Sequence, residues 1–164
     1  MHGLGISAND WPEPIAALLR DHQMMRGMLK ELGYAVGGRR PDEVRKVADR
    51  LEGVIAHHAV KEERGLFPFL MDEETEEVVS SLYSLMIEHQ EIARHVARVR
   101  ETLEQGEWES LRETSEALAE FLLHHFATEE ASTFPWIVQR LTEEELRAAC
   151  RHVEHIARLA EPET

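Results

Sequence analysis

The chain has 164 residues, 32 of them acidic and 18 basic, so its formal net charge at neutral pH is −14. This length suits one domain with its own hydrophobic core, and we expect a single domain over residues 1–164. The acidic surplus argues against nucleic acid or an anionic membrane as partner, and the lack of a long apolar segment predicts a cytoplasmic protein without a signal peptide or membrane span.

Two helices are predicted in the first half of the chain, because apolar residues recur alternately three and four positions apart. The first begins at Pro14 and ends at Gly37-Gly38. The second begins near Pro41 and loses regularity around Gly65 and Pro68. The inward-facing residues of the first are Ile15, Leu18, His22, Met25, Leu29 and Leu32, and those of the second are Val44, Val47, Leu51, Val54, His58 and Glu62.

The second half predicts three more helices. The third ends at Gly106, and the fourth ends before Pro135. Thr142 and Glu145 form a capping-box pattern that begins a fifth helix, over about residues 142–160, as a lid or flank. The inward-facing residues of the third are Val78, Leu82, Leu85, His89, Ile92, Val96, Val99 and Leu103, and those of the fourth are Leu111, Ser115, Leu118, Leu122, His125 and Glu129.

These elements predict an all-α fold, since no segment has the alternating pattern of a strand. Short connections between long helices favour antiparallel neighbours. We therefore expect an up-down-up-down four-helix bundle over about residues 13–140, with the additional C-terminal helix beside it.

The two halves of the chain repeat each other at a fixed shift of 67 residues. The shift aligns HHAVKEERGLFPFL, residues 57–70, with HHFATEEASTFPWI, residues 124–137. It also aligns His22-Gln23 with His89-Gln90. Because the repeat preserves polar residues as well as apolar ones, helix packing alone does not account for it.

Each of the four bundle helices places one histidine on its inward face, and two of them add a glutamate one turn later. The six residues are His22, His58, Glu62, His89, His125 and Glu129. A carboxylate left unpaired in a core is strongly destabilising, so something must satisfy it. Imidazole nitrogen and carboxylate oxygen are good metal donors, and we expect a pair of metal ions bridged by Glu62 and Glu129.

The donor count indicates a reactive site rather than a structural one. Two histidines and one oxygen from each glutamate give each ion four protein donors, and a bridging oxide or hydroxide would add a fifth. Each ion keeps an open coordination position, whereas in structural metal sites protein donors normally fill every coordination position. We expect two iron ions, although manganese or zinc could use the same donors.

Two pairs of residues lie beside the predicted ligands. His57 and His124 are one position, about 100°, away from the inward face, so we expect them in the shell around the site or at its boundary. Glu63 and Glu130 share this offset, and they either hold ligand imidazoles or lie in solvent.

Other candidates receive structural interpretations. Phe67-Pro68 and Phe134-Pro135 are predicted to end their helices and to pack an aromatic ring beneath the site. Cys150, the single cysteine, cannot form an internal disulfide and is expected to be a small buried side chain. The histidines expected at the surface or boundary are His2, His95, His152 and His155, and the methionines expected to fill the core are Met24, Met25, Met28 and Met86.

Several known metal motifs are absent from the sequence. No histidine has a glutamate three residues before it, as ferritin-like di-iron bundles require, and neither the His-Glu-x-x-His pattern nor cysteine pairs occur.

The spacing of the six predicted ligands, with Phe-Pro after each half, resembles the hemerythrin family and its HHE cation-binding branch. The resemblance covers about residues 13–140. It implies a four-helix bundle with a non-haem di-iron centre that reacts with dioxygen, nitric oxide or peroxide, and it implies that the six residues are the ligands.

Two positions depart from the oxygen-carrying hemerythrins. Those proteins have a second histidine four residues after the third-helix one, where this chain has Ala93, and an aspartate in the last motif, where this chain has His125-x-x-x-Glu129. The departures argue against reversible oxygen carriage. The pattern is more similar to the bacterial branch linked to iron-sulfur repair, nitric oxide or peroxide.

The leading functional hypothesis is therefore a non-haem di-iron protein that binds or reacts with a small diatomic molecule or peroxide. Whether it turns over as an enzyme is left open. The alternative is an iron-responsive sensor or iron-handling module that acts through metal-dependent folding and a protein partner of unknown identity. A metal-free helical scaffold is the third possibility.

Overall fold

The computed structural model describes residues 7–71 and 75–161, and every regular element in these ranges is helical. The prediction of an all-helical fold is thus confirmed. The four long helices are α1 (Ile15–Gly37), α2 (Pro41–Val60), α4 (Glu76–Gln105) and α5 (Trp108–Thr128). The shorter elements are η1 (Ala8–Asp10), η2 (Lys61–Leu66), α3 (Pro68–Met71), η3 (Glu129–Thr133), α6 (Phe134–Arg140) and α7 (Glu143–Ala160).

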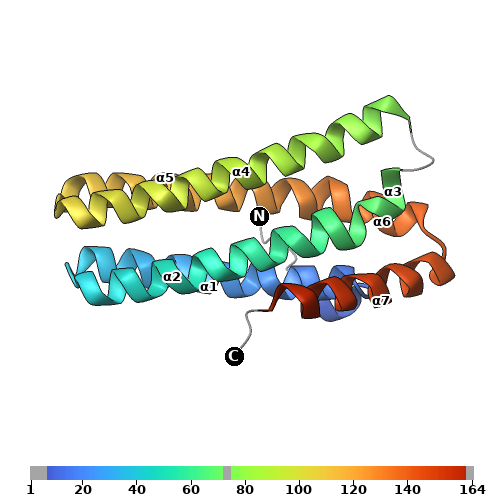
Figure 1. Ribbon diagram of the computed structural model, residues 1–164, viewed down its shortest axis with the longest axis horizontal. Helices are drawn as coiled ribbons and strands as arrows, with labels where there is room; N and C mark the ends of the chain where they lie inside the picture. Colours follow the sequence, from blue (N-terminus) through green and yellow to red (C-terminus); the bar gives the residue numbers. More distant parts are fainter. Residues whose placement is uncertain (1–6, 72–74, 162–164) are drawn as a thin grey trace.

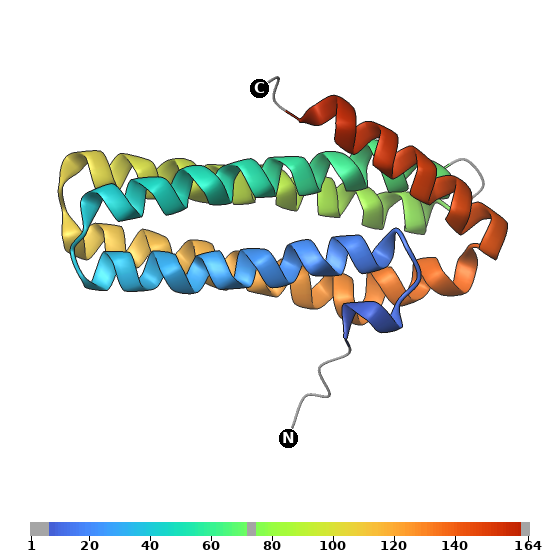
Figure 2. The same ribbon diagram turned by 90° about the horizontal axis from the view of Figure 1, so that it is seen from below.

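The long helices lie side by side as a bundle, and the colour gradient shows successive long helices running in opposite directions (Figure 1, Figure 2). The connections α1–α2 and α4–α5 lie together at one end, and α3, α6 and α7 lie at the other (Figure 1). In the described ranges no helix is both long enough and apolar enough to cross a membrane.

The helix boundaries follow local chemistry. Pro14 precedes the first residue of α1, and Gly106 ends α4 in a left-handed conformation, with φ of 71°, that glycine adopts without strain. At α7 the predicted capping box is present, because the amide of Glu145 donates to Thr142 Oγ1 at 3.2 Å and the Thr142 amide donates to Glu145 Oε2 at 2.7 Å.

The two Phe-Pro motifs do not end their helices as predicted. Instead α2 and α5 widen into the π-helical turns η2 and η3 and then continue as α3 and α6. The amide of Phe67 donates to the carbonyl of Glu62, five residues back, at 2.8 Å. Proline has no amide hydrogen, so the helix must change its hydrogen bonding near Pro68 and Pro135, and a wide turn does this without a break.

The apolar core is divided into two clusters along the bundle. One cluster lies toward the α1–α2 and α4–α5 connections and contains Leu29, Val44 and Leu122. The other contains Ile15 and Phe67 and extends to α6 and α7. The buried histidines and glutamates lie between the two clusters, so a polar layer separates two apolar layers of the bundle.

Helix α7 packs against η2 on the α1–α2 side of the bundle (Figure 1, Figure 2). Gly65 allows this approach, since a Cβ at that position would lie 2.8 Å from Val153 Cγ2. His152 Nε2 lies 3.0 Å from the carbonyl oxygen of Arg64, and His57 Nε2 lies 3.1 Å from that of Ala157. The fifth helix is therefore a flank of the bundle, as predicted.

Candidate metal centre

The six predicted ligands come together in the polar layer of the bundle. The exposed fractions of the four histidines are 0 to 7%, and those of Glu62 and Glu129 are 0%. Each of α1, α2, α4 and α5 supplies one histidine, and the π turns η2 and η3 carry the two glutamates. Both glutamates thus lie at the start of the irregular turns, where the backbone departs from the α-helix.

The donor atoms form two sets that share both glutamates. The first set is His22, His58, Glu62 and Glu129, and the second is His89, His125, Glu62 and Glu129. Within each set the donor atoms all lie within 4.8 Å of one another. We call these arrangements the His22–His58 half and the His89–His125 half of the centre.

Each shared carboxylate directs one oxygen to each half. Glu62 Oε1 lies 3.1 Å from His58 Nε2, and Glu62 Oε2 lies 3.0 Å from His89 Nε2. Glu129 Oε2 lies 3.1 Å from His22 Nε2, and Glu129 Oε1 lies 3.1 Å from His125 Nε2. This is the arrangement of two carboxylates that can bridge two cations.

The protein itself leaves most of these donor atoms unsatisfied. Within the described chain, no hydrogen-bond partner is found for either oxygen of Glu62 or Glu129, or for Nε2 of His89 and His125. His22 Nε2 and His58 Nε2 face each other at 3.2 Å. Unpaired polar atoms are strongly unfavourable in a core, and a cation in each half would satisfy these. The residues therefore fit a two-metal centre.

An outer carboxylate contacts Nδ1 of each histidine. The four contacts are Glu130 Oε1 to His22 at 2.9 Å, Asp21 Oδ2 to His58 at 3.1 Å, Glu63 Oε1 to His89 at 2.7 Å and Glu88 Oε2 to His125 at 2.5 Å. An ionised carboxylate only accepts hydrogen bonds, so Nδ1 carries the proton and donates it. This tautomer turns the Nε2 lone pair of each neutral imidazole toward the centre, as metal-binding histidines require.

The electrostatics of the metal-free centre favour protonated histidines. Burial alone lowers the pKa of His58, but the charge of Glu62 and the hydrogen bond to Asp21 raise it to about 9. Burial likewise opposes protonation of His89, yet Glu62 and Glu63 raise its pKa to about 10. Although burial raises the pKa of Glu62, the facing imidazoles lower it well below its usual range. A metal ion must therefore compete with protons.

The outer carboxylates were only partly predictable. The sequence left two interpretations of Glu63 and Glu130, contact with the imidazoles or a position in solvent. The structure shows the first, because each of them contacts an imidazole. Asp21 and Glu88 were missed, although they precede His22 and His89 and are acidic in both repeats. The sequence signal for them is that the 67-residue shift aligns one acidic residue, Asp21, with another, Glu88.

Several secondary predictions need correction. His57 is partly buried, at the boundary of the bundle as predicted, and its Nε2 lies near the carbonyl oxygen of Ala157 in α7. His124 is exposed, because it lies on the outer face of α5. Cys150 is only partly buried, with its Sγ 3.7 Å from Glu154 Oε1, because α7 covers one side of the bundle and leaves its own outer face in solvent. His95 and His152 lie at the boundary and His155 is exposed, as expected, whereas His2 lies outside the described residues.

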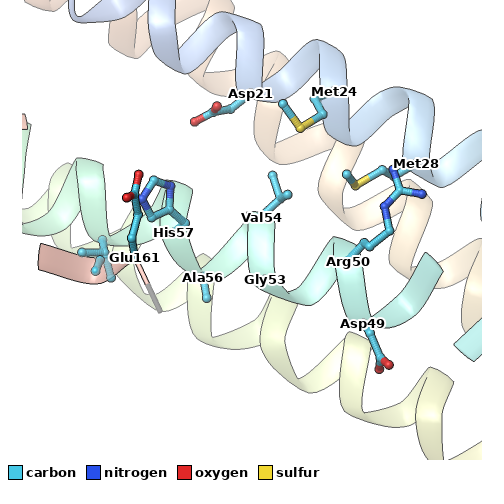
Figure 3. A pocket seen from close by; sticks show the side chains of 12 residues that line it. Asp21, Met24, Met28, Asp49, Arg50, Gly53, Val54, Ala56, His57 and Glu161 are labelled. Carbon is cyan, nitrogen blue, oxygen red and sulfur yellow. The ribbon is translucent and has the colours of Figure 1, made fainter. Parts of the chain in front are cut away.

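Aromatic rings pack on the centre, and one methionine does not fill the core. Phe134 stacks on His22 with ring centroids 5.6 Å apart, as expected of the Phe-Pro motif, and Phe126 stacks at 4.1 Å. Met25 and Met28 are buried, and Met86 is partly buried. Met24 is 50% exposed. It lines a groove of about 640 Å³ beside α1 and α2 that Asp21 and His57 also line (Figure 3).

The comparisons with known proteins agree with this geometry. A family model described as the hemerythrin HHE cation binding domain matches residues 13–137, a range that contains the six predicted ligands and the four outer carboxylates. Searches of curated proteins and of solved structures found no match. Because the family model covers most of the chain and the buried donors within its range form the two sets described above, this chain belongs to the hemerythrin HHE cation-binding family.

Proposed function

We propose that this chain is a non-haem di-iron protein that binds and reacts with a small oxidant, such as dioxygen, nitric oxide or peroxide. The observation that carries the proposal is the pair of donor sets that share Glu62 and Glu129. Each set offers four protein donors, which leaves room on each ion for a small molecule. An iron pair held here would supply electrons and Lewis acidity.

The proposal includes the up-down-up-down order of the four long helices, which the opposite directions in Figure 1 support.

The residues of the chain would hold and shield such a pair. The outer carboxylates fix the orientation of the four imidazoles, and the shared glutamates offset the positive charge. Phe126 and Phe134 stack on His22 and keep water from that side of the centre. No side chain is assigned as a proton donor or acceptor for the oxidant.

A groove of about 610 Å³ offers a small molecule an approach to the His89–His125 half. It lies between α4 and the end of α5, and its wall includes Glu88, which holds Nδ1 of His125. Ser132 also lines the groove, and the 67-residue shift aligns it with Gly65, where α7 covers the first half of the bundle. Helix α7 thus covers this position in the first half, whereas the aligned position in the second half is open; a separate groove adjoins Asp21 of the first half.

The proposal is tested by loading metal-free protein with ferrous iron under anaerobic conditions and recording absorbance after mixing with nitric oxide, dioxygen or peroxide. We expect a spectral change with at least one of the three. His125→Ala should abolish the change, whereas His124→Ala, its exposed neighbour, should retain it. An iron-loaded protein that responds to none of the three would overturn the proposal.

A second candidate function is an iron-responsive sensor or iron-handling module, which one observation favours. The turn η2 carries Glu62 and also contacts α7 through Gly65 and Arg64. Iron binding at Glu62 would then stabilise the surface on which α7 packs. Hydrogen exchange of α7 with and without a chelator tests this function, and equal protection in the two states would exclude it.

A further inference from the structure

The outer carboxylates of the two halves have different surroundings. In the His22–His58 half both are paired with cations. Arg26 donates from both terminal nitrogens to Glu130, at 2.8 and 3.0 Å, and Lys61 donates to Asp21. Lys61 and Asp21 are largely buried, so solvent screens this pair less than it screens a surface pair.

In the His89–His125 half, among the described residues, the outer carboxylates have hydrogen bonds only to the histidines. Within the described residues, neither Glu63 nor Glu88 has a lysine or arginine partner. Their contacts with Nδ1, at 2.7 and 2.5 Å, are also shorter than the 2.9 and 3.1 Å of the other half. Within the described residues, the two negative charges beside this half therefore have no neighbouring lysine or arginine.

The internal repeat shows that the two halves share their carboxylates and differ in these two cations. The 67-residue shift aligns all ligands and also the outer carboxylates, Asp21 with Glu88 and Glu63 with Glu130. It aligns Arg26 with Ala93, and Lys61 with Thr128. The duplicated centre thus keeps every carboxylate in both halves and has the two positive side chains in only one.

This charge difference acts on a bound cation in two ways. A carboxylate without a cation attracts a positive ion nearby, whereas Arg26 and Lys61 repel it. A carboxylate that is not neutralised also pulls more strongly on the Nδ1 proton, which makes Nε2 of that histidine a stronger donor. Both effects favour the same half.

We propose that the two halves load in a fixed order, with the first divalent cation bound in the His89–His125 half. The proposal rests on the proposed two-metal function. Grooves adjoin an outer carboxylate in both halves, Asp21 in one and Glu88 in the other, so the order rests on the charge difference and not on access.

The test uses one equivalent of Co²⁺ added to the metal-free full chain and anomalous X-ray diffraction to locate the ion. In the unchanged protein we expect the ion in the His89–His125 half. Removal of the cations, in Arg26→Ala with Lys61→Thr, should give similar occupancy of both halves. Arg50→Ala, which removes a cation paired with Glu31 instead, should leave the order unchanged.

The repeat also allows the charges to be moved to the other half. Position 93 is exposed and position 128 is partly exposed, so Ala93→Arg and Thr128→Lys have room to reach Glu63 and Glu88. Combined with the removal of Arg26 and Lys61, they should move the first Co²⁺ to the His22–His58 half. If Arg26 and Lys61 only stabilised the fold, moving their charges to the other half would not reverse the order of metal loading.

Three results would overturn the proposal. In the unchanged protein they are equal occupancy of the two halves and a first ion in the His22–His58 half, and in the charge-exchanged variant it is an unchanged order. If the chain binds two Co²⁺ ions but the first lies in the His22–His58 half, the loading order is wrong and the proposed two-metal function still stands. A chain that binds no Co²⁺ even in excess removes the metal centre and the loading order together.

Discussion

At the scale of single residues, the centre depends on the two nitrogens of each imidazole having different partners. Nδ1 donates to an outer carboxylate, and Nε2 faces the shared glutamates. In the metal-free protein the raised pKa values of His58 and His89, about 9 and about 10, mean that both rings are protonated near neutral pH. Metal binding and proton binding therefore exclude each other at Nε2.

This competition predicts that metal uptake releases protons. Below about pH 9 each bound ion must displace at least one histidine proton, so affinity should rise by about tenfold per pH unit for each proton displaced. The rise should level off once the pH passes the raised pKa values. Calorimetric titration of metal-free protein in buffers of different ionisation enthalpy measures the protons released, and uptake without proton release at pH 7 would contradict this description.

Residue identity and register were sufficient to predict the six converging side chains, because a histidine and a glutamate four positions apart share one face of a helix. They were not sufficient for Asp21 and Glu88. Each of these lies next to a ligand in sequence but contacts the histidine of a different helix, Asp21 that of α2 and Glu88 that of α5. Such a partner depends on how the helices pack, which periodicity alone does not describe.

At the scale of elements, the unexpected feature is the pair of π turns that carry the glutamates. The sequence has a proline six residues after each of Glu62 and Glu129, and this pattern predicts a helix end. Proline removes one backbone hydrogen-bond donor, and this loss alone does not decide whether the helix ends or widens into a π turn. Here the buried Phe67 and Phe134 hold the continuing chain in the core.

The packing of α7 on η2 leads to a test of this element. Gly65→Ala should destabilise the protein by roughly 1–3 kcal/mol, because its Cβ would lie 3.0 Å from the Val153 Cα and 2.8 Å from the Val153 Cγ2. Ser132→Ala changes the aligned, exposed position in η3 and should be nearly neutral. Thermal unfolding of both variants measures the difference in stability. Equal stabilities would contradict the prediction, because they would mean that α7 shifts to admit the added methyl group without destabilising the protein.

At the scale of the whole molecule, the bundle consists of two similar halves whose surroundings differ. Helix α7 covers the first half at Gly65, and the aligned residue of the second half, Ser132, lines an open groove. The sequence predicted the repeat and the extra helix. It could not say which half the helix covers, because that depends on the close approach at Gly65 and on hydrogen bonds to carbonyl groups that any sequence contains.

Iron content after anaerobic ferrous loading tests whether the six buried side chains hold two metal ions. We expect two iron ions per chain in the unchanged protein, one for each donor set, and a strong loss in Glu62→Ala and Glu129→Ala. The exposed Glu120→Ala should bind as much iron as the unchanged protein. If the unchanged protein binds no iron, or if the two glutamate variants bind it equally well, the six residues form a buried polar network in a helical scaffold and the account is wrong.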